Sequence, residues 1–140
     1  MGFSPLEGVP MTTRSGSIDP GALIYLLRER GLTVDGLDHA LEHESGLAGL
    51  SGGSGDVREL DPDSLALVVY VHRIAAAVAA STASLGGLDA IVFTGGVGEH
   101  SALVRERVTA RVRYLGDFEV RVVESREELV IARAVRSVLG

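Results

Sequence analysis

The sequence contains no cysteine, which excludes disulfide bonds, thiolate catalysis and zinc sites built on cysteine. It has no tryptophan and only 4% aromatic residues, so a core must be built from leucine, valine, isoleucine and alanine. Apolar residues make up 46% of the 140 residues, which suits one domain with a buried core. The formal net charge of −6 argues against a nucleic acid or an anionic membrane surface as partner.

Targeting and membrane segments are not predicted either. The first residues lack a basic stretch followed by an apolar one, as a secretory signal requires, and Leu6 breaks the myristoylation pattern. Residues 65–88 are long enough to span a membrane, but His72 and Arg73 interrupt them, so we interpret this stretch as a buried helix. We expect a cytoplasmic protein, with which the absence of cysteine is compatible.

Local signals divide the first half of the chain into loops and short helices. Residues 1–18 are rich in glycine, proline, serine and threonine without periodicity, which predicts a loop. Asp19 and Pro20 predict a helix start, because aspartate caps helices and proline suits the first helical position, and Gly31 ends this helix. We expect a short amphipathic helix over 35–43 and a glycine- and serine-rich loop over 45–60.

The second half is expected to alternate helices and strands. The longest helix is predicted to start at Asp61-Pro62 and to end at Gly86, and it is apolar nearly all round, which predicts burial. A strand over 88–94, a helix over 101–115, a strand over 118–124 and a helix over 125–139 follow, the last with a capping box of Ser125 and Glu128. This order predicts a parallel βαβ unit, although two strands are too few for a complete α/β sheet.

A glycine-rich turn between a predicted strand and a helix is the first candidate site. Gly95, Gly96 and Gly98 could present free backbone N–H groups and a helix dipole to an anion. The dinucleotide fingerprint is not met, because Ser101 stands where its last glycine would be, and the loop has no Walker A lysine. A tight turn without a ligand is the alternative.

Charged residues elsewhere form weaker candidates. Arg14 lies in a serine-, threonine- and glycine-rich loop, where its guanidinium could clamp a phosphate or simply be solvated. Asp56 and Arg58 flank a glycine- and serine-rich loop, which suits nucleotide contact or a surface ion pair. Glu127 could place an oxygen near a Mg²⁺ ion that accompanies phosphates, or complement a helix dipole. A histidine pair four residues apart, His39 and His43, lacks a third ligand, so we predict no metal there.

Four blocks of the sequence, in their order, resemble the C-terminal part of the acetate and propionate kinase family. "MGFSPLEGVPMTTRSGSIDPG" is similar to that family's Gly-Phe-Thr-Pro-Leu-Glu-Gly and Gly-Thr-Arg-x-Gly-x-Ile-Asp-Pro signatures. "SGLAGLSGGSGDVREL" resembles its Ser-Gly-Leu-x-Gly-Ile-Ser-x-x-Ser-x-Asp-Met-Arg segment. "GGLDAIVFTGGVGEHSALVRERV" resembles its strand–Gly-Ile-Gly-Glu-Asn–helix segment, and "REELVIAR" its Asn-Glu-Glu-Leu-x-Ile-Ala-Arg close.

The resemblance implies a fold and a reaction. The fold is α/β, of the acetate and sugar kinase/Hsc70/actin (ribonuclease H-like) type, helix-rich with a short parallel sheet. Residues 1–140 would form a single incomplete C-terminal domain, with the N-terminal domain absent. The reaction is reversible phosphoryl transfer from ATP to acetate, giving ADP and acetyl phosphate, with Mg²⁺. The expected partners are therefore ATP or ADP and acetate or another short-chain acyl acid, with no nucleic acid and no membrane.

The resemblance also assigns roles to individual residues. Arg14 would be catalytic and would stabilise the phosphoryl group in transfer, and Glu127 would associate with Mg²⁺. Such groups are the expected parts, because phosphoryl transfer depends on positioning and charge stabilisation. The residues that would bind the nucleotide lie in two segments, Asp56, Val57 and Arg58 in the first and Gly96, Val97, Gly98, Glu99 and His100 in the second.

The chain also departs from the family pattern. The family's N-terminal phosphate contacts, substrate-site arginine, catalytic aspartate and histidine, and His-Leu-Gly-Asn-Gly loop are absent, and the segments after Asp56 and over 116–124 are shortened. His100 and Arg126 each replace an asparagine, and a cation beside Glu127 would weaken its attraction for Mg²⁺. We therefore expect an acetate-kinase-like chain that is inactive alone, paired with itself as a homodimer or with a separate N-terminal half. The alternatives are a non-catalytic module for nucleotide binding or dimerisation, and a truncated gene product.

Overall fold

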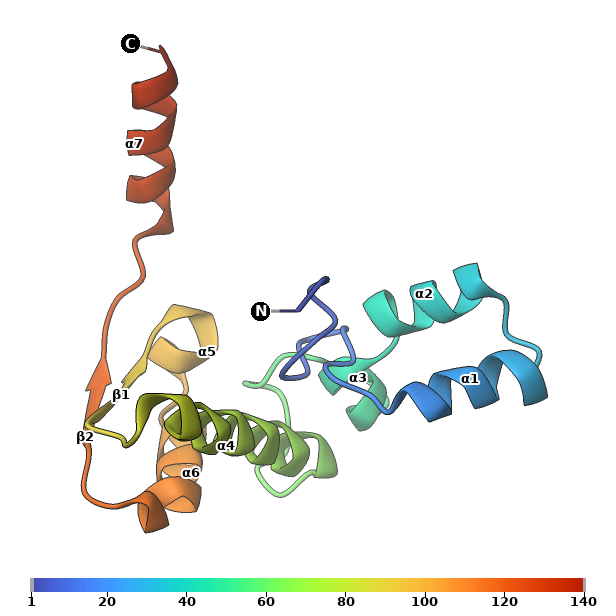
Figure 1. The fold of residues 1–140 in the computed structure, drawn as a ribbon, viewed down its shortest axis with the longest axis horizontal. Coiled ribbons are helices and arrows are strands. Elements are labelled where there is room, and N and C mark those ends of the chain that lie inside the picture. Colours follow the sequence, from blue (N-terminus) through green and yellow to red (C-terminus); the bar gives the residue numbers. More distant parts are fainter. Residues whose placement is uncertain (1, 140) are drawn as a thin grey trace.

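The computed structural model describes residues 2–139 and shows two groups of helices joined by one long helix (Figure 1). The elements in chain order are α1 (Pro20–Glu29), α2 (Val34–His43), α3 (Gly46–Ser51), α4 (Leu65–Leu85), β1 (Ala90–Phe93), α5 (Gly95–His100), α6 (Ala102–Val112), the 3-10 helix η1 (Arg113–Leu115), β2 (Glu119–Val122) and α7 (Glu127–Leu139). Helices α1 and α2 lie side by side at one end, and the strands lie with α5 and α6 at the other (Figure 1).

The two strands form the predicted parallel unit. Strand β1 pairs with β2 in parallel, with Ile91 opposite Val120 and Phe93 opposite Val122, and the connection between them contains α5 and α6. Among residues 2–139 no further strand joins this sheet, which has the order β1-β2. The predicted βαβ unit is therefore confirmed, together with the absence of any strand from the first half of the described chain.

The core lies between α4, α6 and β1. Helix α6 buries Val104, Val108 and Val112, which recur every four residues and so share one face of the helix. They pack in one apolar cluster with residues from α4 and from the strand, namely Leu67, Val71, Ala75, Ile91 and Phe93. The apolar stripe predicted for this helix is confirmed, and it decides where the βαβ unit meets the long helix.

Two helix starts differ from the sequence-based prediction. Helix α4 begins at Leu65, not at Asp61-Pro62, because the Asp61 carboxylate accepts the N–H of Asp63 in a turn and Ser64 caps the helix. Helix α7 begins at Glu127, and the backbone carbonyl of Arg126 accepts from the helix's first turn. The predicted capping box was therefore wrong, because Ser125 lies one residue too early to cap this helix.

The glycine- and serine-rich stretch over 45–60 is not all loop. It contains the short helix α3, whose Leu47 and Ala48 N–H groups donate to the carbonyl oxygens of Met11 and Thr12, each at 2.9 Å. These acceptors come from a loop far away in sequence, so no local signal could predict them. The contact holds the N-terminal loop against α3, and both segments line the cavity described below.

Helix α4 is less buried than its composition predicts. By length and composition it is the one helix among residues 2–139 that could cross a membrane. Only 22% of the residues in its most apolar stretch are buried within the structure. It buries one stripe, Ala66, Leu67, Val71 and Ala75, against the core, and Leu65 and Leu85 are exposed. The prediction of burial all round was wrong, because the contacts that α3 and α6 make with this helix bury four of its residues among those that the structure describes.

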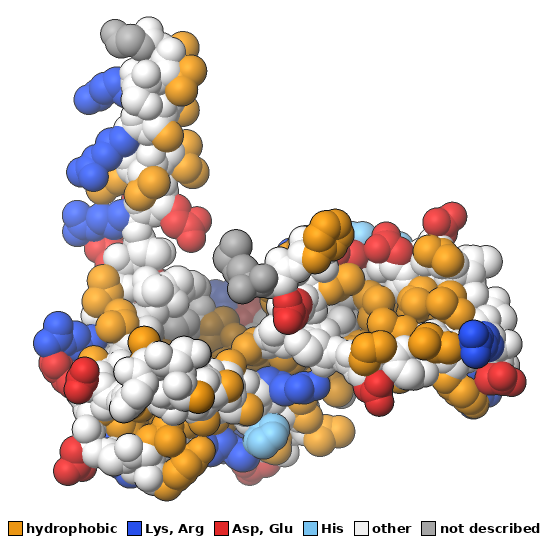
Figure 2. All heavy atoms as spheres, in the orientation of Figure 1, with side chains coloured by type: hydrophobic (Ala, Val, Ile, Leu, Met, Phe, Trp, Pro, Cys, Tyr) orange, Lys and Arg blue, Asp and Glu red, His pale blue; other side chains and the backbone are white. Residues whose placement is uncertain are grey.

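Helix α7 extends away from the rest of the molecule (Figure 1). None of the residues Glu127–Leu139 is buried. Figure 2 shows arginine side chains along one side of this helix and apolar side chains along the other. The exposed apolar residues are Leu129, Val130, Ile131, Val135, Val138 and Leu139. This helix is therefore amphipathic, and nothing in the described chain covers its apolar face.

Candidate functional site

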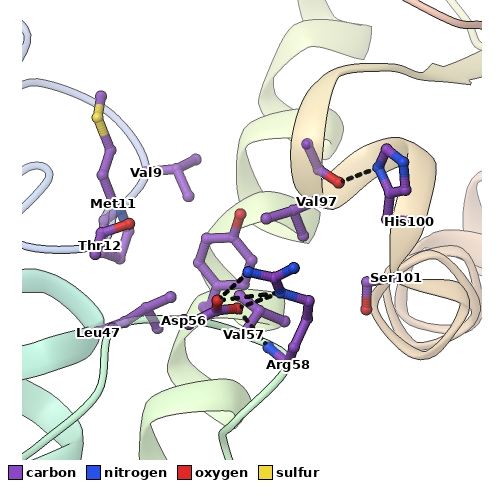
Figure 3. Close-up of a pocket in the computed structure, with 14 residues that line it drawn as sticks. Val9, Met11, Thr12, Leu47, Asp56, Val57, Arg58, Val97, His100 and Ser101 are labelled. Carbon is purple, nitrogen blue, oxygen red and sulfur yellow. Dashed lines mark hydrogen bonds and ion pairs between the residues drawn. The ribbon is translucent and has the colours of Figure 1, made fainter.

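An open cavity of about 740 Å³ lies between the N-terminal loop and α5 (Figure 3). Its residues come from five places in the chain and are listed from N- to C-terminus as Val9, Pro10, Met11, Thr12, Leu47, Gly55, Asp56, Val57, Arg58, Tyr70, Gly96, Val97, His100 and Ser101. The volume lies within the range usual for small-molecule sites. The walls are largely apolar, with a few polar groups between them, which is the usual character of such sites.

The structure brings together the two segments that the sequence assigned to the nucleotide. Asp56, Val57 and Arg58 lie between the N-terminal loop and α5, and Val97 and His100 face them from α5 (Figure 3). Sequence reasoning missed the opposite wall, residues 9–12 and Leu47, together with Tyr70 of α4. Contacts between distant parts of the chain, among them those of the N-terminal loop with α3, place residues 9–12 here.

A glycine keeps the loop of residues 55–58 close to the N-terminal loop. A Cβ atom on Gly55 would lie 2.5 Å from the carbonyl oxygen of Thr12, which is closer than atoms can approach. A larger residue would push the two loops apart, and both loops line the cavity. The serine- and glycine-rich character of this segment therefore has a packing reason.

Asp56 and Arg58 form a local ion pair at the cavity. The Arg58 guanidinium donates to both carboxylate oxygens of Asp56, with Nε at 2.9 Å from Oδ1, and the Arg58 backbone N–H donates to Oδ1 at 2.9 Å. These side-chain and backbone hydrogen bonds lower the pKa of Asp56 to about 2. The same pairing raises the pKa of Arg58. Both charges are therefore present at neutral pH, and the Arg58 side chain stays 81% exposed.

His100 presents one ring nitrogen to its own helix. Its Nδ1 lies 2.9 Å from the carbonyl oxygen of Gly96, and because a carbonyl only accepts, Nδ1 must carry the proton (Figure 3). In the neutral ring Nε2 is then an acceptor. Tyr70, which is half-buried, adds a hydroxyl group, and burial raises its pKa. The cavity thus offers hydrogen-bond donors and acceptors beside its apolar walls.

The glycine-rich turn does not form the predicted anion site at its first amide. Gly95 opens α5, and its N–H donates to Oε1 of Glu99 at 2.6 Å. The carboxylate of the chain itself thus takes the place of an external anion at this amide. The prediction of free N–H groups was wrong for Gly95, whereas Gly96 and Val97 do line the cavity.

Arg14 lies outside the cavity, although its neighbours Met11 and Thr12 line it. Its Nε donates to Oε2 of Glu42 on α2 at 2.5 Å, and its side chain is 41% exposed. The Thr13 hydroxyl also donates to the Glu42 carbonyl, so the end of α2 holds this loop. A role of Arg14 toward phosphate stays a prediction, and in this structure its partner is a carboxylate.

Glu127 is exposed in the first turn of α7 and does not line the cavity. Arg126, beside Glu127, pairs with Glu124 at 3.4 Å. The ring centroids of His39 and His43 on α2 lie 5.0 Å apart, and Oε1 of Glu44 is 3.5 Å from Nε2 of His39. Residues 2–139 contain no group of three or more histidine, aspartate or glutamate side chains that could hold a metal ion. The residues present therefore do not form a magnesium site by themselves, and Glu127 could add one oxygen to an ion that phosphates carry.

The sequence was compared with family models and with known proteins. The model of the Acetokinase family matches residues 1–135. Acetate kinase of Protochlamydia amoebophila is 50% identical over 121 residues, which cover 83% of this chain and 30% of that protein. Acetate kinase of Deinococcus deserti is 40% identical over 172 residues, which cover 100% of this chain and 43% of that protein. The second alignment is longer than the 140 residues of this chain, so it contains gaps here, as shortened segments require.

The structure was compared with solved structures. Acetate kinase of Porphyromonas gingivalis matches with a TM-score of 0.89 at 33% identity, over 100% of this chain and 43% of that one. A propionate kinase from Francisella tularensis matches with a TM-score of 0.87 at 33% identity, over 94% of this chain and 41% of that one. The fold is therefore that of acetate and propionate kinases, the acetate and sugar kinase/Hsc70/actin type, as predicted. The chain spans less than half the length of these relatives, and it belongs to the Acetokinase family.

Proposed function

We propose that this chain binds ATP or ADP in the cavity and so provides the nucleotide part of an acetate-kinase-type site. The observation that carries the proposal is that two segments far apart in sequence, which the family resemblance assigns to the nucleotide, line one cavity: Asp56, Val57 and Arg58 from the first and Gly96, Val97 and His100 from the second. The family match over residues 1–135 supports the same assignment.

The chemistry of the cavity fits a nucleoside. Val57, Val97 and Leu47 offer an apolar surface on which a base can lie, and His100 offers the Nε2 acceptor to an amino group or hydroxyl. Arg58 is mostly exposed and could turn from Asp56 to a phosphate, because exposed ion pairs are weak. A nucleotide could thus use both the apolar walls and the charged rim.

The reaction of the family would be phosphoryl transfer between ATP and acetate or propionate. Arg14 would stabilise the phosphoryl group after leaving Glu42, and Glu127 would supply one oxygen to a Mg²⁺ ion that accompanies the nucleotide. The remaining groups of such a site would come from the part of the relatives that this chain does not span. We therefore expect nucleotide binding without robust turnover by this chain alone, and a cytoplasmic location, where ATP is available.

Calorimetry on the full chain tests the proposal. Titration with ADP and with Mg-ATP at millimolar concentration should give saturable heat. Arg58→Ala should weaken binding, because it removes the guanidinium that would turn to a phosphate. Arg28→Ala, which removes the same charge from α1 outside the cavity, should leave binding unchanged. Absence of heat in the wild-type chain would refute nucleotide binding, and robust acetyl phosphate formation in a coupled assay would refute the expected inactivity.

A second candidate function is a non-catalytic module that associates through α7. The observation that favours it is the uncovered apolar face of this helix. The candidate partner is the part of an acetate kinase that the chain does not span, and a homodimer is the other outcome. Light scattering after size-exclusion chromatography separates these outcomes, since a homodimer has twice the monomer mass without any added partner. Val135→Asp should abolish association if this face mediates it.

A further inference from the structure

The carboxylate of Glu99 joins two segments that follow parallel strands. Its Oε1 accepts the Gly95 N–H at 2.6 Å and the Ser125 N–H at 2.8 Å. Gly95 opens α5 just after β1, and Ser125 lies between β2 and α7. Because parallel strands end at the same edge of a sheet, these segments meet there, and one side chain can reach both.

Neither amide has another acceptor among residues 2–139. Gly95 is the first residue of α5, so it has no partner within that helix, and Ser125 precedes the helical part of α7. The hydrogen bond from Ser125, helped by the one from Gly95, lowers the pKa of Glu99, so its charged form makes these contacts at neutral pH. The titratable and charged side chains nearby are His100 and Arg105, and the latter donates to the carbonyl oxygens of Gly98 and Glu99.

Glu99 itself does not line the cavity, although its neighbours on α5, Gly96, Val97 and His100, do. Its carboxylate is therefore directed to the two amides and away from the space that a nucleotide would fill. At the other end of the contact, Ser125 lies two residues before the first residue of α7, whose residues are all exposed. The last backbone hydrogen bond before this junction runs from Val123 to Phe93, so the bond to Glu99 is the final tether before α7.

We propose that Glu99 is a positioning residue that clamps the α5 wall of the cavity to the start of α7. The clamp orients α7 and holds the turn that carries Gly96 and Val97, and Glu99 does not contact the nucleotide. The effect on the nucleotide rests on the proposed function, whereas the effect on α7 does not. Glu99→Gln weakens the clamp, because it removes the charge and leaves a neutral acceptor oxygen. Ser125→Pro removes the N–H donor on the other side and leaves α5 intact.

Spectroscopy tests the clamp directly. In ¹H–¹⁵N spectra, Glu99→Gln should shift the amide protons of both Gly95 and Ser125 upfield and speed their exchange with solvent. Glu106→Gln removes the same charge from the exposed face of α6 and is the matched control. An unchanged Ser125 amide in Glu99→Gln would overturn the proposal.

Distance measurement tests the effect on α7. The chain has no cysteine, so Ser84→Cys and Ser137→Cys allow nitroxide labels on α4 and α7 without other changes. The distance distribution between the labels should broaden in Glu99→Gln and in Ser125→Pro but not in Glu106→Gln. Should Glu99→Gln fail to fold, Ser125→Pro alone must reproduce the broadening. A distribution equal to that of the wild type would overturn the proposal.

Calorimetry with ADP tests the link to the cavity. Both clamp variants should bind ADP about three- to tenfold more weakly, which corresponds to the weakening of charge-assisted hydrogen bonds in the first variant and the loss of one hydrogen bond in the second. Unchanged affinity in both variants would overturn this link. If the wild-type chain does not bind ADP, the proposed function fails, and the clamp is then judged by the amide shifts and the label distances.

Discussion

Gly96 offers a substitution whose effects on stability and on binding should have opposite signs. It lies in α5 and lines the cavity, and a Cβ atom at this position would meet no heavy atom within 4 Å. Its φ is not in the left-handed region. Gly96→Ala should therefore stabilise the fold by about 0.5 kcal/mol, because glycine in a helix costs more conformational entropy than alanine. The new methyl group would occupy space that a bound nucleotide needs, so ADP affinity should fall at least about tenfold, or about 1.4 kcal/mol.

Urea unfolding followed by circular dichroism measures the first effect, and calorimetry with ADP measures the second. Gly53→Ala is the matched control, because a Cβ atom at Gly53 also meets nothing within 4 Å and Gly53 does not line the cavity. That variant should bind ADP like the wild type. The reasoning fails if Gly96→Ala binds ADP with wild-type affinity, because the nucleotide then does not lie against α5. It also fails if both alanine variants lose affinity equally, since the loss would then not be local to the cavity.

Three further predictions concern charge, core and recognition. The pKa of Asp56 is lowered to about 2, so its ion pair with Arg58 stabilises the fold at pH values above the ordinary aspartate pKa. This stabilisation is lost as the pH falls from about 4 toward 2. The difference in the free energy of unfolding between the wild type and Asp56→Asn should therefore change only within that pH window. Val108→Ala, at 0% exposure, should lower the free energy of unfolding in urea by about 2–3 kcal/mol, whereas Val138→Ala, at 84% exposure, should change it by less than about 0.5 kcal/mol. His100→Ala should weaken ADP binding about three- to tenfold in calorimetry, and His100→Asn, which restores the residue of the family pattern, should recover most of the loss.

The second half of the fold could be predicted from local sequence patterns. Val104, Val108 and Val112 recur with the helical period and are buried as expected, and the apolar run at Ile91 and Phe93 forms strand β1. Asp19 caps α1 as predicted, since its carboxylate accepts the Gly21 N–H. In each case the partners lie within a few residues or on one face, so a short window of sequence carries the information.

The failures at α3, at the faces of α4 and α7 and at Ser125 share a physical reason, which is that the partners are distant in sequence or are not provided by the described chain, whereas the misplaced start of α4 has a local cause. Helix α3 depends on carbonyl oxygens of Met11 and Thr12, and Ser125 donates to Glu99, so neither could be inferred locally. The apolar patterns of α4 and α7 predict that a face can be buried, but burial also needs a surface to pack against. The described chain provides one for a single stripe of α4 and none for α7.

For the candidate site, the sequence predicted which segments meet but not which of their groups are free to bind a ligand. Motif resemblance placed Asp56–Arg58 and Gly96–His100 together, and the structure brings both segments to one cavity. The resemblance could not show which groups of a matched segment are free to meet a ligand. Glu99 matches the family motif, yet its carboxylate already accepts two backbone N–H groups of the chain itself.

Arg14 is a second residue that matches the family motif but already has a partner within the chain. Thr12, two residues earlier, lines the cavity, whereas the Arg14 guanidinium pairs with Glu42 outside it. That pair is partly exposed, and exposed ion pairs contribute about 1 kcal/mol or less. A phosphate group accepts from a guanidinium through two oxygens at once and carries more charge than one carboxylate. A phosphate would therefore compete with Glu42 for the Arg14 guanidinium.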